Sequence, residues 1–145
     1  MKKEPRIKQL MTPFPHAIER GAGVLEARKL MLEHRIRHLP VMHNHELVGL
    51  ISDRDIKLML GPEFDYPSPR DLSVDEVMVE NPYVVDLDTA LRTVLRHMAD
   101  AHIGTALVTK SGRLAGIFTA TDACRHFAEW LEHEFPPPSD GTDAA

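Results

Sequence analysis

Two segments of this chain, GLISDRD (Gly49 to Asp55) and GIFTATD (Gly116 to Asp122), have the same pattern. Each has a glycine, two apolar residues, a hydroxyl residue, two variable residues and an aspartate, and the two lie 67 positions apart (116 − 49). The same offset, without a gap, pairs Met11 with Met78, Pro15 with Pro82, Met31 with Met98, Ile36 with Ile103, Val41 with Val108 and Leu47 with Leu114. A repeat that stays in register over this length indicates one supersecondary unit present twice.

The apolar pattern predicts the same element order in both copies. In the second copy, Leu91, Val94, Leu95 and Met98 follow helical spacing, and Asp88 is the expected N-cap. Val24, Ala27 and Met31 have the same phase in the first copy. Two short β segments follow each helix, at 39–42 with 47–51 and at 106–109 with 114–118. A second helix is expected from Ser52 and from Thr119, and a short strand precedes each first helix, so each copy reads βαββα.

These elements predict an α+β chain of two units. The first unit spans 7–60, a proline-rich linker spans 61–72, and the second unit spans 73–133. Residues 134–145 have the composition of a disordered tail. Phe127 and Trp130, three residues apart in the last helix, are expected to pack back on the body.

Composition limits the classes of partner. A net charge of −5 argues against nucleic acid as the main partner, because proteins that neutralise phosphate backbones are usually basic. A single cysteine, Cys124, is expected to be buried or partly buried and structural, and it favours a reducing cytoplasm. No apolar run has the length of a membrane span, and the first residues lack a secretory signal, so we expect no membrane partner.

The repeated hydroxyl and aspartate are the candidate ligand groups. Ser52 and Thr119 stand where a strand passes into a helix, and backbone N–H groups at a helix start favour a phosphate. Asp55 and Asp122 follow one turn later, where a carboxylate can accept hydrogen bonds from a ribose diol. The same residues also form the capping-box pattern, which stabilises a helix start and binds nothing. The two roles are compatible, and the duplication favours a ligand.

With these motifs and the segments IKQLMTPFPHAI, IRHLPVM and LVGLISDRDI, the chain resembles a tandem cystathionine-β-synthase (CBS) domain pair, or Bateman module, of the stand-alone type. The resemblance runs from Ile7 to His133. It implies two βαββα units packed sheet to sheet with pseudo-twofold symmetry, and two clefts that bind AMP, ADP, ATP or a related adenosyl ligand. It also implies that Asp55 and Asp122 hold ribose and that Ser52 and Thr119 hold phosphate, with no required cofactor.

The resemblance places further residues in these clefts. In the first copy they are Thr12, Pro15, Ile36, Arg37, His38, Pro40 and Arg54. In the second copy they are Pro82, Ile103, Gly104, Thr105 and Ala106. The basic residues Arg37, His38 and Arg54 correspond to Gly104, Thr105 and Thr121, so we expect unequal clefts. Which cleft receives Arg37 and His38 stays open at this point.

The expected function is therefore regulatory and not catalytic. Ligand binding changes the packing of the two units and passes to an effector protein, and the resemblance implies a disc-like homodimer. The alternative is a protein-interaction scaffold with vestigial clefts. We expect no metal site, because His43 and His45 are more simply polar residues of a turn. No motif of a Walker loop or a nucleophile elbow is present.

Overall fold

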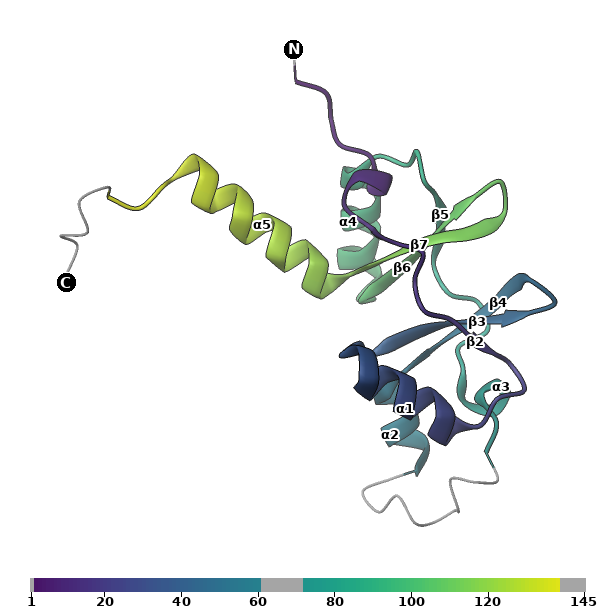
Figure 1. The fold of residues 1–145 in the computed structure, drawn as a ribbon. Helices are drawn as coiled ribbons and strands as arrows, with labels where there is room; N and C mark the ends of the chain where they lie inside the picture. Colours follow the sequence, from purple (N-terminus) through teal and green to yellow (C-terminus); the bar gives the residue numbers. More distant parts are fainter. Residues whose placement is uncertain (1, 61–71, 139–145) are drawn as a thin grey trace.

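The computed structural model describes residues 2–60 and 72–138, and its two halves repeat one order of elements (Figure 1). The first half contains η1 (Ile7–Gln9), β1 (Thr12–Pro13), β2 (Ile18–Glu19), α1 (Val24–His34), β3 (His38–His43), β4 (Glu46–Ser52) and α2 (Asp53–Leu60). The second half contains α3 (Val74–Val77), β5 (Val84–Asp86), α4 (Leu91–Ala101), β6 (Thr105–Lys110), β7 (Arg113–Thr119) and α5 (Ala120–Glu134). Residues 61–71 of the predicted linker and 139–145 of the predicted tail lie outside the described part of the chain.

The strands form two sheets, which confirms the predicted α+β class. One sheet has the order β2-β3-β4 and the other has the order β1-β7-β6-β5. Each is built on an antiparallel hairpin, β3 with β4 and β6 with β7, and each hairpin has a parallel strand beside it. The sheets meet where β4 contacts β7, and the helices α1, α2 and α4 lie on the outer sides (Figure 1).

The first residues of each half pair with a strand of the other half. β1 pairs with β7, so that Thr12 lies opposite Ile117, and an isolated bridge joins Leu50 to Val79. Because Thr12 and Val79 are 67 residues apart, as are Leu50 and Ile117, these are two copies of one crossing. The two halves are therefore interlocked and not simply adjacent.

The two repeated glycines lie where the halves cross, and their lack of a side chain lets the other half come close. A Cβ on Gly49 would stand 2.7 Å from the sulfur of Met78 and 2.8 Å from the carbonyl oxygen of Val79. A Cβ on Gly116 would in the same way meet the sulfur of Met11. The glycine in each motif is thus required by the approach of the other half's methionine.

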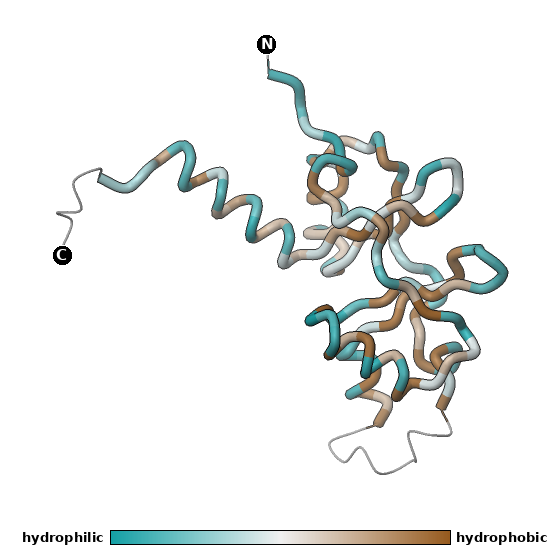
Figure 2. The backbone as a smooth tube through the Cα atoms, viewed as in Figure 1, coloured by the Kyte–Doolittle hydropathy of each residue, from teal (hydrophilic) through white to brown (hydrophobic). Residues whose placement is uncertain are grey.

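Each half has its own hydrophobic core. Helix α1 buries Val24, Ala27 and Met31, at the spacing expected of one helix face. The second core gathers Val94, Met98, Ala106, Val108 and Phe118. Figure 2 shows the apolar residues concentrated along the strands and the inner helix faces.

The predicted N-cap of α4 is wrong. The cap residue is Ala90, which makes no side-chain hydrogen bond. Asp88 lies in the preceding turn, where its backbone N–H donates to Asp86 Oδ2 and its carboxylate accepts from Lys8 Nζ at 2.6 Å. The aspartate is therefore used to hold the N-terminal segment and not to cap the helix.

The expected packing of the last helix is also wrong. α5 points away from the body (Figure 1) and contains no buried residue. Phe127 and Trp130 are 62% and 52% exposed and stack on each other, with their ring centroids 5.9 Å apart. Cys124, which we expected to be buried or partly buried, is exposed on the same helix.

Candidate functional site

A cleft of about 700 Å³ lies between the first half's loop after β1 and the start of α5. From the first half it is lined by Thr12, Pro13, Phe14, Pro15, His16, Arg35, Ile36, Arg37 and His38. From the second half it is lined by Ile117, Thr119, Thr121, Asp122 and Arg125. The site is therefore shared, because the first half supplies the loop, Arg35 and Arg37, and the second half supplies the motif hydroxyl, the carboxylate and Arg125.

The motif in this cleft is a capped helix start. Thr119 Oγ1 accepts a hydrogen bond from the Asp122 N–H at 3.2 Å, and Asp122 Oδ2 accepts from the Thr119 N–H at 2.9 Å. Asp122 Oδ1 is bound by Arg125 Nη1 at 3.1 Å, and the carboxyl side chain is 13% exposed. A diol bound here would either share the Asp122 carboxylate with the exposed Arg125 or displace Arg125 from it. Its hydroxyl groups would donate to a carboxylate that is already held in position.

The first-half motif has the same arrangement. Ser52 Oγ donates to Asp55 Oδ2 at 2.8 Å and accepts from the Asp55 N–H at 3.0 Å. The Asp53 N–H donates to the Arg37 carbonyl, and the Ala120 N–H donates to the Gly104 carbonyl in the second half. The capping interpretation is thus confirmed, and several first-turn amides that we expected to face a phosphate already have protein acceptors. Side-chain cations must contribute more of any phosphate binding.

The cleft around Asp122 has an excess of positive charge. Arg35, Arg37 and Arg125 line it against the single carboxylate. Arg35 ends α1 in the left-handed conformation with φ 55°, which turns the chain into the cleft. Phe14, with φ 48° and 90% of its surface exposed, forms an apolar lip at the same opening. Such a cleft suits an anion joined to an apolar ring.

Seven of the predicted site residues are brought together here: Thr12, Pro15, Ile36, Arg37, His38, Thr119 and Asp122. The structure therefore answers the question that the sequence left open, because Arg37 and His38 lie with Asp122. The residues outside this cleft are Pro40, Ser52, Arg54, Asp55, Pro82, Ile103, Gly104, Thr105 and Ala106. Pro40 and Ala106 are fully buried, so they support strands and do not line the opening.

Sequence reasoning missed Arg35 and Arg125. Arg125 follows Asp122 by three residues, so helical spacing alone puts both on one side of the first turns of α5. Arg35 adjoins Ile36, which was predicted, but its direction depends on the helix end. The spacing pointed to Arg125, whereas nothing in the sequence pointed to Arg35.

His38 is half-buried, and burial lowers its pKa below the ordinary 6.5. The carboxylates of Asp55 and Asp122 act in the opposite direction, while Arg37 lowers the pKa further. The folded protein therefore favours neutral His38, whereas the unfolded chain takes up a proton below about pH 6.5.

We expect the contribution of His38 to stability to be complete above pH 6.5 and to be lost as the pH falls below it, because the unfolded state then binds more protons. Urea unfolding at pH 7.5 and pH 5.5 measures this loss. His38→Gln should lose less stability between the two pH values than the unmodified protein. An equal loss in both proteins would show that His38 does not carry this pH dependence.

Within the described ranges, no group of three or more His, Cys, Asp and Glu side chains is placed to hold a metal ion. In the same part of the chain, no helix combines the length and the apolar content needed to span a bilayer.

Comparisons with known proteins agree on one family. The zinc metalloprotease MJ0392 of Methanocaldococcus jannaschii is 32% identical over 85% of this chain, and the match covers 32% of that protein. The uncharacterized protein YlbB of Bacillus subtilis is 30% identical over 81% of this chain and 78% of its own length. The chain spans a third or less of the first curated relatives that it matches.

A solved structure shares the whole arrangement. The CBS domain pair of protein MJ0100, in complex with 5′-methylthioadenosine and S-adenosyl-L-methionine, superposes with a TM-score of 0.77 at 25% identity. The match covers 88% of this chain and 99% of that one. The family model for the CBS domain matches residues 7–61 and again residues 74–129. With both halves matched and the paired fold shared, this chain belongs to the CBS domain family and carries two copies of the domain.

Proposed function

We propose that this protein is a regulatory module that binds an adenine nucleotide, AMP, ADP or ATP, or a related adenosyl ligand between its two CBS domains. The observation that carries the proposal is the shared cleft, in which Asp122 stands opposite Arg35 and Arg37 beside the apolar lip of Phe14 and Pro15. The carboxylate suits a ribose diol, the guanidinium groups suit phosphate, and the lip suits a purine ring. The adenosyl ligands of the MJ0100 pair support the same ligand class.

We further propose that the two clefts differ in ligand preference. At the 67-residue offset, Arg35, Arg37 and Arg125 correspond to His102, Gly104 and Leu58. The positions that correspond to the three arginines in the repeat around Asp55 therefore hold no arginine, although Arg54 takes the place of Thr121. A phosphorylated ligand should prefer the cleft around Asp122. The cleft around Asp55 should stay empty or take a ligand without phosphate.

Ligand binding changes how the two domains pack, and the effector protein responds to that change. Both halves contribute to the shared cleft, so a ligand contacts them together and favours one relative arrangement. It can shift that arrangement only by binding one state better than the other. The proposed module is non-catalytic, and any enzyme activity of its longer relatives belongs to the remainder of those proteins.

A scaffold with vestigial clefts is the second candidate. It is favoured by the capping boxes, because Asp55 and Asp122 already have hydrogen-bond partners within the chain. Thermal unfolding with millimolar AMP, ATP, 5′-methylthioadenosine or S-adenosylmethionine separates the two candidates, because a ligand of the folded state must raise the midpoint. Native mass spectrometry of freshly purified protein would identify a retained nucleotide. No midpoint shift with any of the four ligands would favour the scaffold.

The role of the cations has its own test. Arg37→Ala should weaken AMP binding about three- to tenfold, because the exposed guanidinium interacts with phosphate through solvent. Adenosine, which lacks the phosphate, should bind the variant as well as it binds the unmodified protein. Arg54→Ala is the matched control, since Arg54 lies outside this cleft. Isothermal titration at two salt concentrations measures all three proteins. An equal loss for AMP and adenosine would argue against a phosphate contact at Arg37.

A further inference from the structure

Both oxygens of the Asp122 carboxylate already have a partner within the chain. Oδ2 accepts a hydrogen bond from the Thr119 N–H at 2.9 Å, and Oδ1 forms an ion pair with Arg125 Nη1 at 3.1 Å. Only 13% of the Asp122 side chain is exposed, whereas 58% of the Arg125 side chain is exposed. A ligand hydroxyl that is to reach Oδ1 therefore competes with the guanidinium group of Arg125.

The equivalent carboxylate in the first half has no arginine at the corresponding position. Both hydrogen bonds that the Asp55 side chain accepts from Ser52 go to Oδ2, and Leu58 corresponds to Arg125 at the 67-residue offset. Leu58 is 72% exposed, so this helix position is not needed for packing in the first half. The capping box therefore forms without an arginine, and stability of the helix start does not account for Arg125.

A phosphorylated ligand would offer Arg125 a second anion. Arg125 lines the shared cleft together with Arg35 and Arg37. A phosphate monoester carries about two negative charges near pH 7, and it accepts paired hydrogen bonds from a guanidinium group. Because Arg125 is more than half exposed, its guanidinium group can turn from the carboxylate toward such a phosphate without disturbing buried side chains. Oδ1 of Asp122 is then open to a ribose diol.

We propose that Arg125 makes the shared cleft selective for phosphorylated adenosyl ligands over adenosyl ligands without a phosphate. This role rests on the proposed function, because it concerns the specificity of the same site. AMP provides a phosphate that draws Arg125 away from Oδ1, so its ribose meets an open carboxylate. Adenosine has no such group, so its ribose must displace the Asp122–Arg125 ion pair without compensation.

Replacing Arg125 by leucine, the residue at the corresponding position of the first half, should change the two affinities in opposite directions. Arg125→Leu should weaken AMP binding about three- to tenfold, because a phosphate contact is lost. The same variant should strengthen adenosine binding about two- to fivefold, because an exposed ion pair no longer competes for Oδ1 of Asp122. Isothermal titration with each ligand measures both changes, and circular dichroism establishes that the variant is folded.

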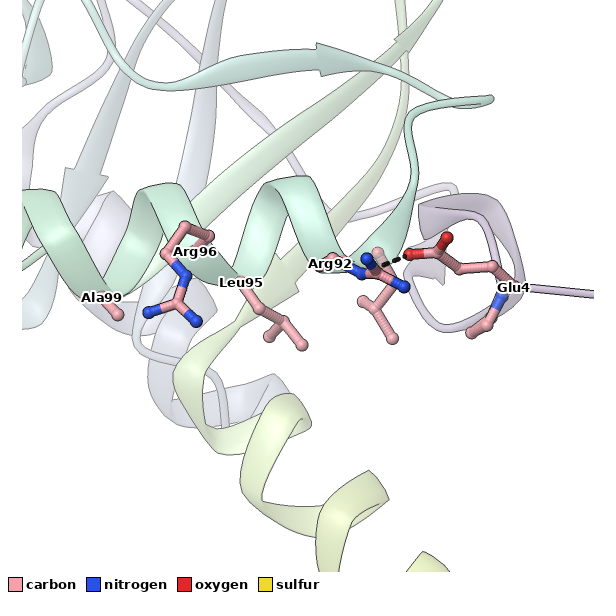
Figure 3. A pocket seen from close by; sticks show the side chains of 7 residues that line it. Glu4, Arg92, Leu95, Arg96 and Ala99 are labelled. Atoms are coloured by element: carbon pink, nitrogen blue, oxygen red, sulfur yellow. Dashed lines mark ion pairs between the residues drawn. The ribbon is translucent and has the colours of Figure 1, made fainter.

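A second exposed arginine–carboxylate pair supplies the matched control. Arg92 Nε pairs with Glu4 at 3.0 Å beside a groove of about 460 Å³ along α4, where Arg96 also projects (Figure 3). Arg92 is not among the residues that line the shared cleft. Arg92→Leu removes a similar pair and a similar charge, so it should leave the affinities for AMP and adenosine unchanged.

Salt tests the same competition in the unmodified protein. Raising the ionic strength from about 50 mM to about 500 mM screens an exposed ion pair. Adenosine is neutral, so its affinity should rise with salt only to the extent that the Asp122–Arg125 pair weakens. The affinity of Arg125→Leu for adenosine should not change over the same range. An equal response of both proteins would argue against competition by Arg125.

Three results with Arg125→Leu would overturn the proposal. A loss for AMP alone, the pattern expected of Arg37→Ala, would make Arg125 a phosphate contact that does not compete with ribose. A loss for adenosine would mean that Arg125 positions the Asp122 carboxylate and does not cover it. Unchanged affinity for both ligands would place Arg125 outside the site. If the unmodified protein bound neither ligand, the proposed function itself would fail, and the selectivity would fail with it.

Discussion

Replacing Asp122 by alanine is expected to weaken AMP binding about tenfold to a hundredfold. The carboxylate is largely enclosed in the shared cleft and is fixed by the Thr119 N–H and by Arg125. A hydrogen bond to a charged group contributes about 1.5–3 kcal/mol, and each 1.4 kcal/mol corresponds to a factor of about ten in affinity. Asp122 should therefore contribute more to affinity than the exposed Arg37. Isothermal titration with AMP measures the change.

The first half supplies the matched control for this experiment. Asp55→Ala removes the same capping box from a helix start, with the same local cost of about 0.5–2 kcal/mol in stability. It lies outside the cleft that contains the arginines, so the tighter AMP site should keep its affinity. Circular dichroism would establish that both variants are folded. If a folded Asp122→Ala protein bound AMP as tightly as the unmodified protein, the carboxylate would have no part in the site.

Local features of the fold could be predicted because they depend on residues close in sequence. The strands around Leu39 to Met42 and Leu47 to Ile51 were found from apolar runs and a polar turn, and the structure extends each run by one residue at either end. The motif helices begin at Asp53 and Ala120, directly after the expected Ser52 and Thr119. The repeat strengthened each prediction, because the same pattern occurred twice at one offset.

Features set by long-range packing could not be predicted in this way. Arg37 and Asp122 line the same cleft because the two halves cross, and no spacing within one half predicts this. Asp88 follows a cap pattern, but Lys8, 80 positions away, takes its carboxylate. The apolar spacing of Phe127 and Trp130 indicated a buried face. Both side chains are instead exposed on α5, because the direction of that helix depends on packing that spacing within the helix does not contain.

Because the halves cross, Ile7→Ala is expected to lower the free energy of unfolding by about 2–5 kcal/mol. Ile7 is fully buried among Val94, Met98 and Phe118, although it belongs to the first half by sequence. Its N–H donates to the Thr89 carbonyl at 2.8 Å, so the N-terminal turn is anchored on the second half. A loss of this size is a large part of the stability of a typical domain. Urea unfolding measures it, with Leu32→Ala, a truncation of an exposed side chain, as the control within about 0.5 kcal/mol of the unmodified protein.

Hydrogen exchange distinguishes this crossing from a simple loss of core volume. Ile7→Ala should lower amide protection mainly in β6 and β7, the strands that its side chain covers, and less in β3 and β4. Val74, its counterpart 67 residues on, is buried in the first core, and its N–H donates to the Ala22 carbonyl. Val74→Ala should therefore give the reverse pattern, with a smaller total loss because fewer methyl groups are removed. If Ile7→Ala instead lowered protection chiefly in β3 and β4, the N-terminal turn would stabilise the half that contains it in sequence, and the two halves would not be interlocked.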